Sequence, residues 1–98
     1  MIRVVCRREN GWDLRLSGHA GTAPYGEDLV CAAVTALVCA LAQYVSEQEP
    51  TAHIHLQPGD AQIKAEGESL APAFQTVLAG LQLLEKDYPE GVGVRWEI

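Results

Sequence analysis

Apolar and polar residues alternate in five segments of the chain, and a period of two predicts half-buried β-strands. The segments cover residues 2–7, 12–17, 52–57, 61–65 and 92–98. Residues 28–47 and 69–86 instead show apolar positions spaced as on one side of an α-helix. The sequence therefore predicts the element order ββαββαβ.

Two helices that cover one face of a sheet bury both apolar stripes in the simplest way. We therefore expect an α+β fold with a mixed, largely antiparallel five-stranded sheet and two helices packed on one face. The chain has 98 residues, of which 48% are hydrophobic. That length fits one domain, so residues 1–98 are expected to form a single domain.

The loop between the first two strands sets their register. A three-residue loop with Gly11 in the left-handed conformation pairs Cys6 with Leu14 and keeps both apolar sets on one face. A two-residue Asn-Gly turn would place those sets on opposite faces. The preferred register also sets Arg7 opposite Asp13, as a cross-strand charge pair.

The second hairpin is expected to turn at Gly59 and Asp60, with Gly59 first, as in a type II′ turn. This register pairs Leu56 with Ile63.

His53 and His55 share one face of their strand, as two metal ligands would. The expected register places them opposite Glu66 and Lys64, and the sequence offers no third ligand nearby. Solvated neighbours are therefore the preferred interpretation, and neither a metal nor another cofactor is expected.

Several positions are expected in the core or at its edge. The helix over residues 28–47 is apolar nearly all round, which predicts that most of it is buried. Trp12 and Trp96 lie on the strand faces assigned to the core. Ser69 is expected to cap the second helix, and the acidic residues within 85–90 are expected to be solvated.

Charge and cysteine content limit the classes of function. The formal net charge is −6, which argues against direct nucleic-acid binding and favours a basic partner. No uninterrupted apolar run is long enough to suggest a membrane span. Three cysteines without an export signal or a zinc-ligand spacing predict reduced thiols in the cytoplasm.

The candidate chemistry lies at the start of the first helix. Asp28 is a good N-cap whose carboxylate could accept from the N–H of Val30 or Cys31. The helix start favours a thiolate at Cys31. Glu27 and Asp28 oppose it, and a protonated His19 would offset them.

The same stretch offers further supporting groups. Amides near Cys31 and Ala32 could donate to an oxyanion. Gly18, Gly21 and Gly26 would let a peptide backbone approach closely.

Other interpretations remain open at this point. A cysteine in an apolar helix is most often a small buried residue, and core packing is expected for Cys6 and Cys39. The chain could be a non-enzymatic adaptor that binds a peptide by strand addition. It could also be a redox sensor that uses Cys31.

Two stretches resemble the ribosomal-processing cysteine protease family Prp: G-H-A at residues 18–20 and G-E-D-L-V-C-A-A-V-T-A-L at residues 26–37. Thr35 stands where the family more often has serine, and Leu29 where isoleucine is common. The resemblance implies that Cys31 is the nucleophile and His19 the general base, while Asp28 is assigned to capping and orientation.

The resemblance also implies a substrate and an assembly. In this family a cytoplasmic homodimer removes the N-terminal extension of bacterial large-subunit ribosomal protein twenty-seven, which supports ribosome assembly. The loop at residues 21–25 is a variable part of the pattern and gives no sequence preference for the cleavage site.

Overall fold

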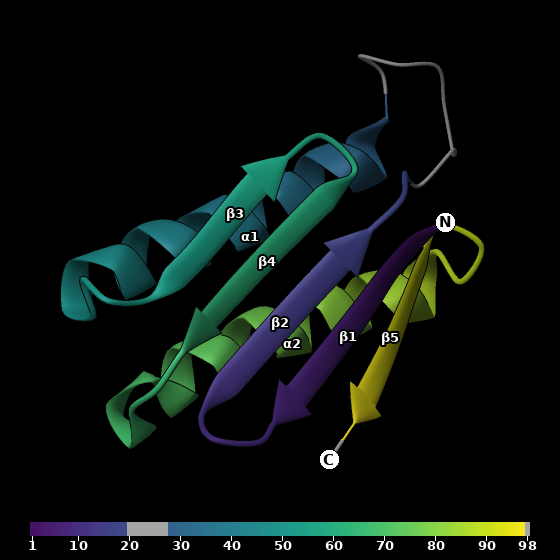
Figure 1. Cartoon of the computed structure of the whole chain (residues 1–98). Coiled ribbons are helices and arrows are strands. Elements are labelled where there is room, and N and C mark those ends of the chain that lie inside the picture. Colours follow the sequence, from purple (N-terminus) through teal and green to yellow (C-terminus); the bar gives the residue numbers. More distant parts are fainter. Residues whose placement is uncertain (20–27, 98) are drawn as a thin grey trace.

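The computed structural model describes residues 1–19 and 28–97 (Figure 1). The elements are, in chain order, β1 (Ile2–Arg8), β2 (Trp12–Ser17), α1 (Leu29–Gln48), β3 (His53–Gln57), β4 (Asp60–Ala65), the short 3₁₀ helix η1 (Glu68–Leu70), α2 (Ala71–Asp87) and β5 (Val92–Glu97). The predicted order ββαββαβ is confirmed.

The five strands form one sheet in the order β3-β4-β2-β1-β5. Only the β1–β5 pair is parallel, and the other three neighbouring pairs are antiparallel. Both helices lie against the same face of this sheet (Figure 1). The predicted α+β fold, a mixed five-stranded sheet with two helices on one face, is confirmed.

The first hairpin has the predicted register, with Cys6 opposite Leu14 and Arg7 opposite Asp13. Gly11 has a φ of 109°, and Asn10 also has a positive φ, of 56°. A Cβ at Gly11 would lie 2.6 Å from a backbone carbonyl oxygen of the neighbouring segment. Only glycine therefore fits this position.

The expected charge pair across this hairpin does not form. Arg7 Nε instead donates to Glu97 Oε1 at 2.7 Å, on the parallel neighbour β5. Asp13 Oδ1 accepts from Gln62 Nε2 at 3.0 Å, on the antiparallel neighbour β4. The hairpin argument considers only β1 and β2, but each of these strands has a second neighbour. Each of the two side chains forms its hydrogen bond with a residue on that second neighbour.

The second hairpin differs from the predicted one. The turn is Pro58-Gly59, and Leu56 pairs with Ala61 instead of Ile63. Proline suits the second position of a type II turn, and Gly59, with a φ of 76°, suits the third. The predicted turn ignored Pro58. Because the error is two residues, every side chain keeps its predicted face.

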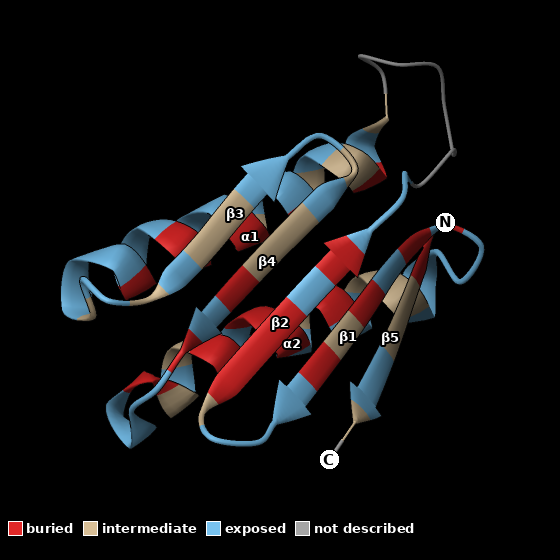
Figure 2. Ribbon diagram, viewed as in Figure 1, coloured by how far each residue is buried: buried red, intermediate tan, exposed pale blue. Residues whose placement is uncertain are grey.

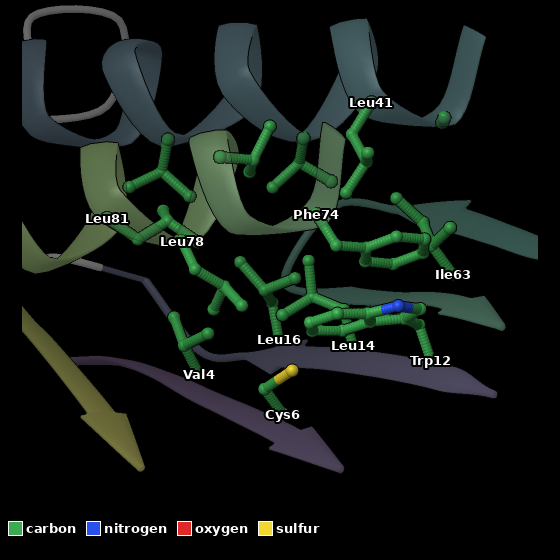
Figure 3. Close-up of a cluster of buried hydrophobic side chains, with 14 of the residues drawn as sticks. Val4, Cys6, Trp12, Leu14, Leu16, Leu41, Ile63, Phe74, Leu78 and Leu81 are labelled. Carbon is green, nitrogen blue, oxygen red and sulfur yellow. The ribbon is translucent and has the colours of Figure 1, made fainter. Parts of the chain in front are cut away.

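The core lies between the sheet and the two helices. Trp12 stacks on Phe74 of α2 with ring centroids 5.2 Å apart and an interplanar angle of 9°. Figure 2 shows the buried positions concentrated on β1, β2 and the inner sides of the helices, and Figure 3 shows the side chains that meet there. The fully buried core includes Val4, Cys6, Leu14, Leu41, Val45, Ile63, Leu70, Leu78, Leu81 and Val92.

Trp96 was expected in this core, but its exposed fraction is 44%. It lies on the predicted face and meets Trp12 edge-on, with ring centroids 6.2 Å apart. Its strand, β5, is the edge of the sheet, and Trp96 is near the end of that strand. The core therefore covers only one side of its ring.

The prediction that α1 is mostly buried is wrong for the chain by itself. Its buried residues are Val30, Val34, Val38, Leu41, Ala42 and Val45, a single stripe. The exposed fraction of Leu29 reaches 81%. A two-layer fold covers only one side of each helix. By length and composition alone α1 could cross a membrane, a test that the core helix of a globular fold also passes.

Both ends of α2 depart from the predictions. Ser69 lies inside η1, and α2 begins after Leu70 without a side-chain cap. At the other end, Glu85 is not simply solvated, because its Oε2 accepts from the backbone N–H of Val94 at 2.8 Å. The carboxylate thereby binds the edge strand β5.

We predict that Phe74→Ala lowers the free energy of unfolding by about 3–5 kcal/mol, because it removes the stacking partner of Trp12 and leaves a cavity. Urea unfolding followed by circular dichroism measures this. Leu83→Ala on the same helix is the matched control, since Leu83 is 62% exposed. Similar losses in both variants would contradict the assigned core.

Candidate active site

His19 follows β2 and lies against the β3–β4 turn. The N–H of Gly18 donates to the carbonyl of Gly59 at 2.9 Å, which extends the β2–β4 pairing past the ends of both strands. A Cβ at Gly59 would lie 2.8 Å from Nε2 of His19. The imidazole therefore packs directly over a glycine of the turn.

Gly18 has a structural reason to be glycine. Its φ is 94°, and a Cβ there would collide with the carbonyl oxygen of Met1. The residue before His19 is thus fixed by a close backbone approach within the chain. Its predicted role beside a substrate backbone stays a prediction.

Cys31 lies in the first turn of α1, which begins as predicted. Asp28 is the N-cap, and its Oδ1 accepts from the N–H of Cys31 at 3.0 Å. The N–H of Ala32 donates to the backbone carbonyl of Asp28 at 3.1 Å. An oxyanion role for the amides of Cys31 and Ala32 stays a prediction, and it requires these bonds to be exchanged for bonds to substrate.

One cavity of about 720 Å³ joins these groups. His19, Asp28 and Cys31 supply polar groups to its wall, along with residues 57–60 of the β3–β4 turn. Its apolar wall includes Ile2, Leu16, Val34, Val38 and Leu56. The volume is in the range of ligand pockets, about 300–1,000 Å³.

The structure thus brings His19, Cys31, Asp28, Gly18 and Ala32 to one cavity. Two predicted supporting glycines, Gly21 and Gly26, lie outside the described residues.

Sequence reasoning missed two parts of the cavity wall. The β3–β4 turn was assigned no role, although the dipeptide Pro58-Gly59 is a strong turn signal. Cys39 was expected in the core, but it is exposed and lines the cavity. It lies about two helical turns after Cys31, on the side of α1 that faces away from the core.

Cys6 is the buried thiol that was predicted. Burial, and secondarily the negative charge of Asp13, raise its pKa to about 11, although Arg8 lowers it. This thiol therefore stays protonated at neutral pH, and it does not take part in the cavity.

The histidine pair on β3 has neighbours other than those predicted. His53 lies opposite Lys64 and His55 opposite Gln62, because the hairpin register is shifted. His55 Nε2 is 3.2 Å from Asp60 Oδ2. Within residues 1–19 and 28–97, no group of three or more His, Cys, Asp or Glu side chains could hold a metal ion.

Solved structures resemble this fold along nearly its whole length. An essential ribosomal processing protease Prp from Staphylococcus aureus, with a covalently linked product peptide, superposes with a TM-score of 0.88 at 24% identity, covering 99% of this chain and 100% of that one. Its complex with a substrate peptide gives 0.81 at 23% identity, with the same coverage. SMU.848 from Streptococcus mutans gives 0.76 at 26% identity, covering 98% and 93%.

Sequence comparison agrees with the fold. The ribosomal processing cysteine protease Prp of Staphylococcus aureus is 27% identical over 95 residues, which is 87% of this chain and 86% of the relative. Residues 1–93 match the family described as cysteine protease Prp. The chain therefore belongs to the cysteine protease Prp family and is a cysteine protease.

Proposed function

We propose that this protease removes the N-terminal extension of large-subunit ribosomal protein twenty-seven, with Cys31 as nucleophile and His19 as general base. The observation that carries the proposal is the shared cavity, which both residues line in a chain of this family. The related Staphylococcus aureus protein is named a ribosomal processing protease.

The position of each thiol favours Cys31 over the other two cysteines. Cys6 is buried and protonated. Cys39 lines the cavity, but it lies in the middle of α1, away from the positive end of the helix. Of the three cysteines, Cys31 alone lies both in the first turn of a helix and in the cavity that His19 lines.

The proposed reaction has two stages. His19 takes the thiol proton, and the sulfur of Cys31 attacks the scissile carbonyl. The tetrahedral intermediate collapses, the C–N bond breaks, and His19 gives its proton to the leaving amine. Water then attacks the thioester with His19 as base, which releases the carboxylate product and restores the thiol.

Asp28 supports this chemistry through the backbone. It anchors the N–H groups of both Cys31 and Ala32, so it fixes where α1 begins and where the sulfur projects. We assign it to positioning and not to proton transfer.

The rest of the proposal concerns the setting of the reaction. The net charge of −6 suits a basic ribosomal protein as substrate. We propose that the enzyme acts in the cytoplasm and that it is a homodimer. Its mass in solution tests the dimer. A redox sensor would also use Cys31; it would react with peroxide yet leave the extended ribosomal protein intact.

Cys31→Ala and Cys31→Ser are expected to abolish cleavage, because each removes the thiol. Both are expected to keep the fold, because neither side chain is larger than cysteine. Incubation with the extended ribosomal protein of the same organism, followed by mass measurement, detects the product. Cys39→Ala is the matched control and is expected to retain cleavage. A cleaving Cys31→Ala variant would end the proposal.

His19→Ala is expected to lower kcat about 10²–10⁴-fold, the usual contribution of a general base. It should also slow the reaction of Cys31 with iodoacetamide, because the thiolate loses its imidazolium partner. His53→Ala is the matched control. Equal labelling rates in wild type and His19→Ala would contradict the assigned pair.

Gly59→Ala tests whether the β3–β4 turn positions His19. A methyl group there requires the ring to move, and misplacement of a catalytic group can cost up to about a hundredfold. We expect kcat to fall at least tenfold. Gly67→Ala also places a side chain at a positive φ, of 117°, but its Cβ would meet nothing closer than 4.0 Å.

A loss of stability is therefore expected in both the Gly59→Ala and Gly67→Ala variants, with a kcat loss in the first alone. An unchanged kcat in Gly59→Ala would show that the turn does not position the ring.

A further inference from the structure

The sheet has two edge strands, β3 and β5, and their outward backbone groups differ. Every second residue of an edge strand directs its N–H and C=O away from the sheet, where another strand could pair with it. Whether those groups are already bound decides which edge is available to a partner.

Two of the three outward amides of β5, those of Val92 and Val94, are capped within the chain. The N–H of Ile2 donates to the carbonyl of Gly91, so the odd-numbered residues of β5 face β1 and the even-numbered ones face outward. The outward N–H of Val92 donates to the carbonyl of Tyr88 at 3.1 Å. The next outward N–H, that of Val94, donates to Glu85 at 2.8 Å.

Within residues 1–19 and 28–97, the outward amides of β3 have no such caps. The bond from Gly18 to Gly59 fixes which residues of β4 face β2, and the alternation then directs Ile54 and Leu56 of β3 outward. The backbone bonds found outside the helices and strands of the described residues include none to Ile54 or Leu56. The strand HIHLQ also lacks the lysine or proline with which exposed edges are usually protected.

The open edge leads into the catalytic cavity. Leu56 lines that cavity, its exposed fraction is 45%, and the turn that follows continues the cavity wall beside His19. An extended chain paired with β3 would therefore lie next to the cavity that Cys31 lines. The capped edge, β5, contributes no residue to the cavity wall among those described.

We propose that the substrate binds as an added strand on β3, where backbone hydrogen bonds to Leu56 and Ile54 hold it extended beside Cys31. The inference rests on the proposed peptidase function and adds the substrate-positioning surface. Because the contacts are with the backbone, they fix the position of the scissile bond without reading its side chains.

The enzyme side of this pairing is tested with Leu56→Pro, which removes one outward N–H from an edge position where proline can be accommodated. Leu56→Ala, which shortens the same side chain but keeps the N–H, is the matched control. The substrate is a synthetic peptide that spans the extension and its cleavage site. We expect KM to be about two- to tenfold higher in Leu56→Pro than in Leu56→Ala, the effect of one lost hydrogen bond.

The contribution of the peptide backbone is tested with wild-type enzyme, so this test does not depend on how Leu56→Pro folds. Peptides methylated at one backbone nitrogen at a time should bind more weakly at alternate positions, because only every second N–H of a paired strand faces its neighbour. Fluorescence anisotropy with labelled peptides and Cys31→Ala gives the same pattern without cleavage.

The outcomes separate the two proposals. Equal effects of methylation at successive positions, with the same KM in Leu56→Pro and Leu56→Ala, overturn strand addition while the peptidase stands. A wild-type enzyme that binds the peptides with alternating affinity but leaves them intact overturns the proposed substrate instead. A halved mass of Leu56→Pro in light scattering assigns the edge to contact between copies and overturns the inference.

Discussion

The pairing of β2 with β4 is the constraint on which the rest of the structure depends. It joins the first hairpin to the second, and it continues past the strand ends through the bond from Gly18 to Gly59. That bond places His19 against the β3–β4 turn, next to the cavity that Cys31 lines. It also fixes which backbone groups of β3 point away from the sheet. One register therefore determines both the position of the histidine and the unpaired groups of the open edge.

Local signals were sufficient where the partner of a segment lies close in sequence. The register of the first hairpin follows from its own alternation and from Gly11, and the capping by Asp28 follows from its place before an apolar helix. The second hairpin shows where this reasoning fails. The alternation of β3 and β4 accepts either register, and only the turn chemistry of Pro58 decides between them.

Layer geometry explains the errors in burial. The apolar pattern assigned Trp96 and Cys39 to the core, yet one lies near the end of an edge strand and the other on the outer side of a helix. Periodicity does not give the exposure of either side chain, because that exposure depends on how many elements cover each face of the sheet and each side of the helix. The closeness of His19 to the β3–β4 turn is likewise a product of tertiary pairing, and the sequence analysis did not predict it.

The site also shows why a helix start by itself is a weak basis for an active thiol. Asp28 occupies the N–H groups of Cys31 and Ala32 and adds a negative charge at the same end of α1. A carboxylate there opposes a second anion nearby. In the proposed mechanism, the imidazolium of His19 must therefore supply much of the stabilisation of the thiolate. Reactivity at Cys31 then depends on the β2–β4 pairing that places the ring, and a local motif becomes active only through a contact between the two hairpins.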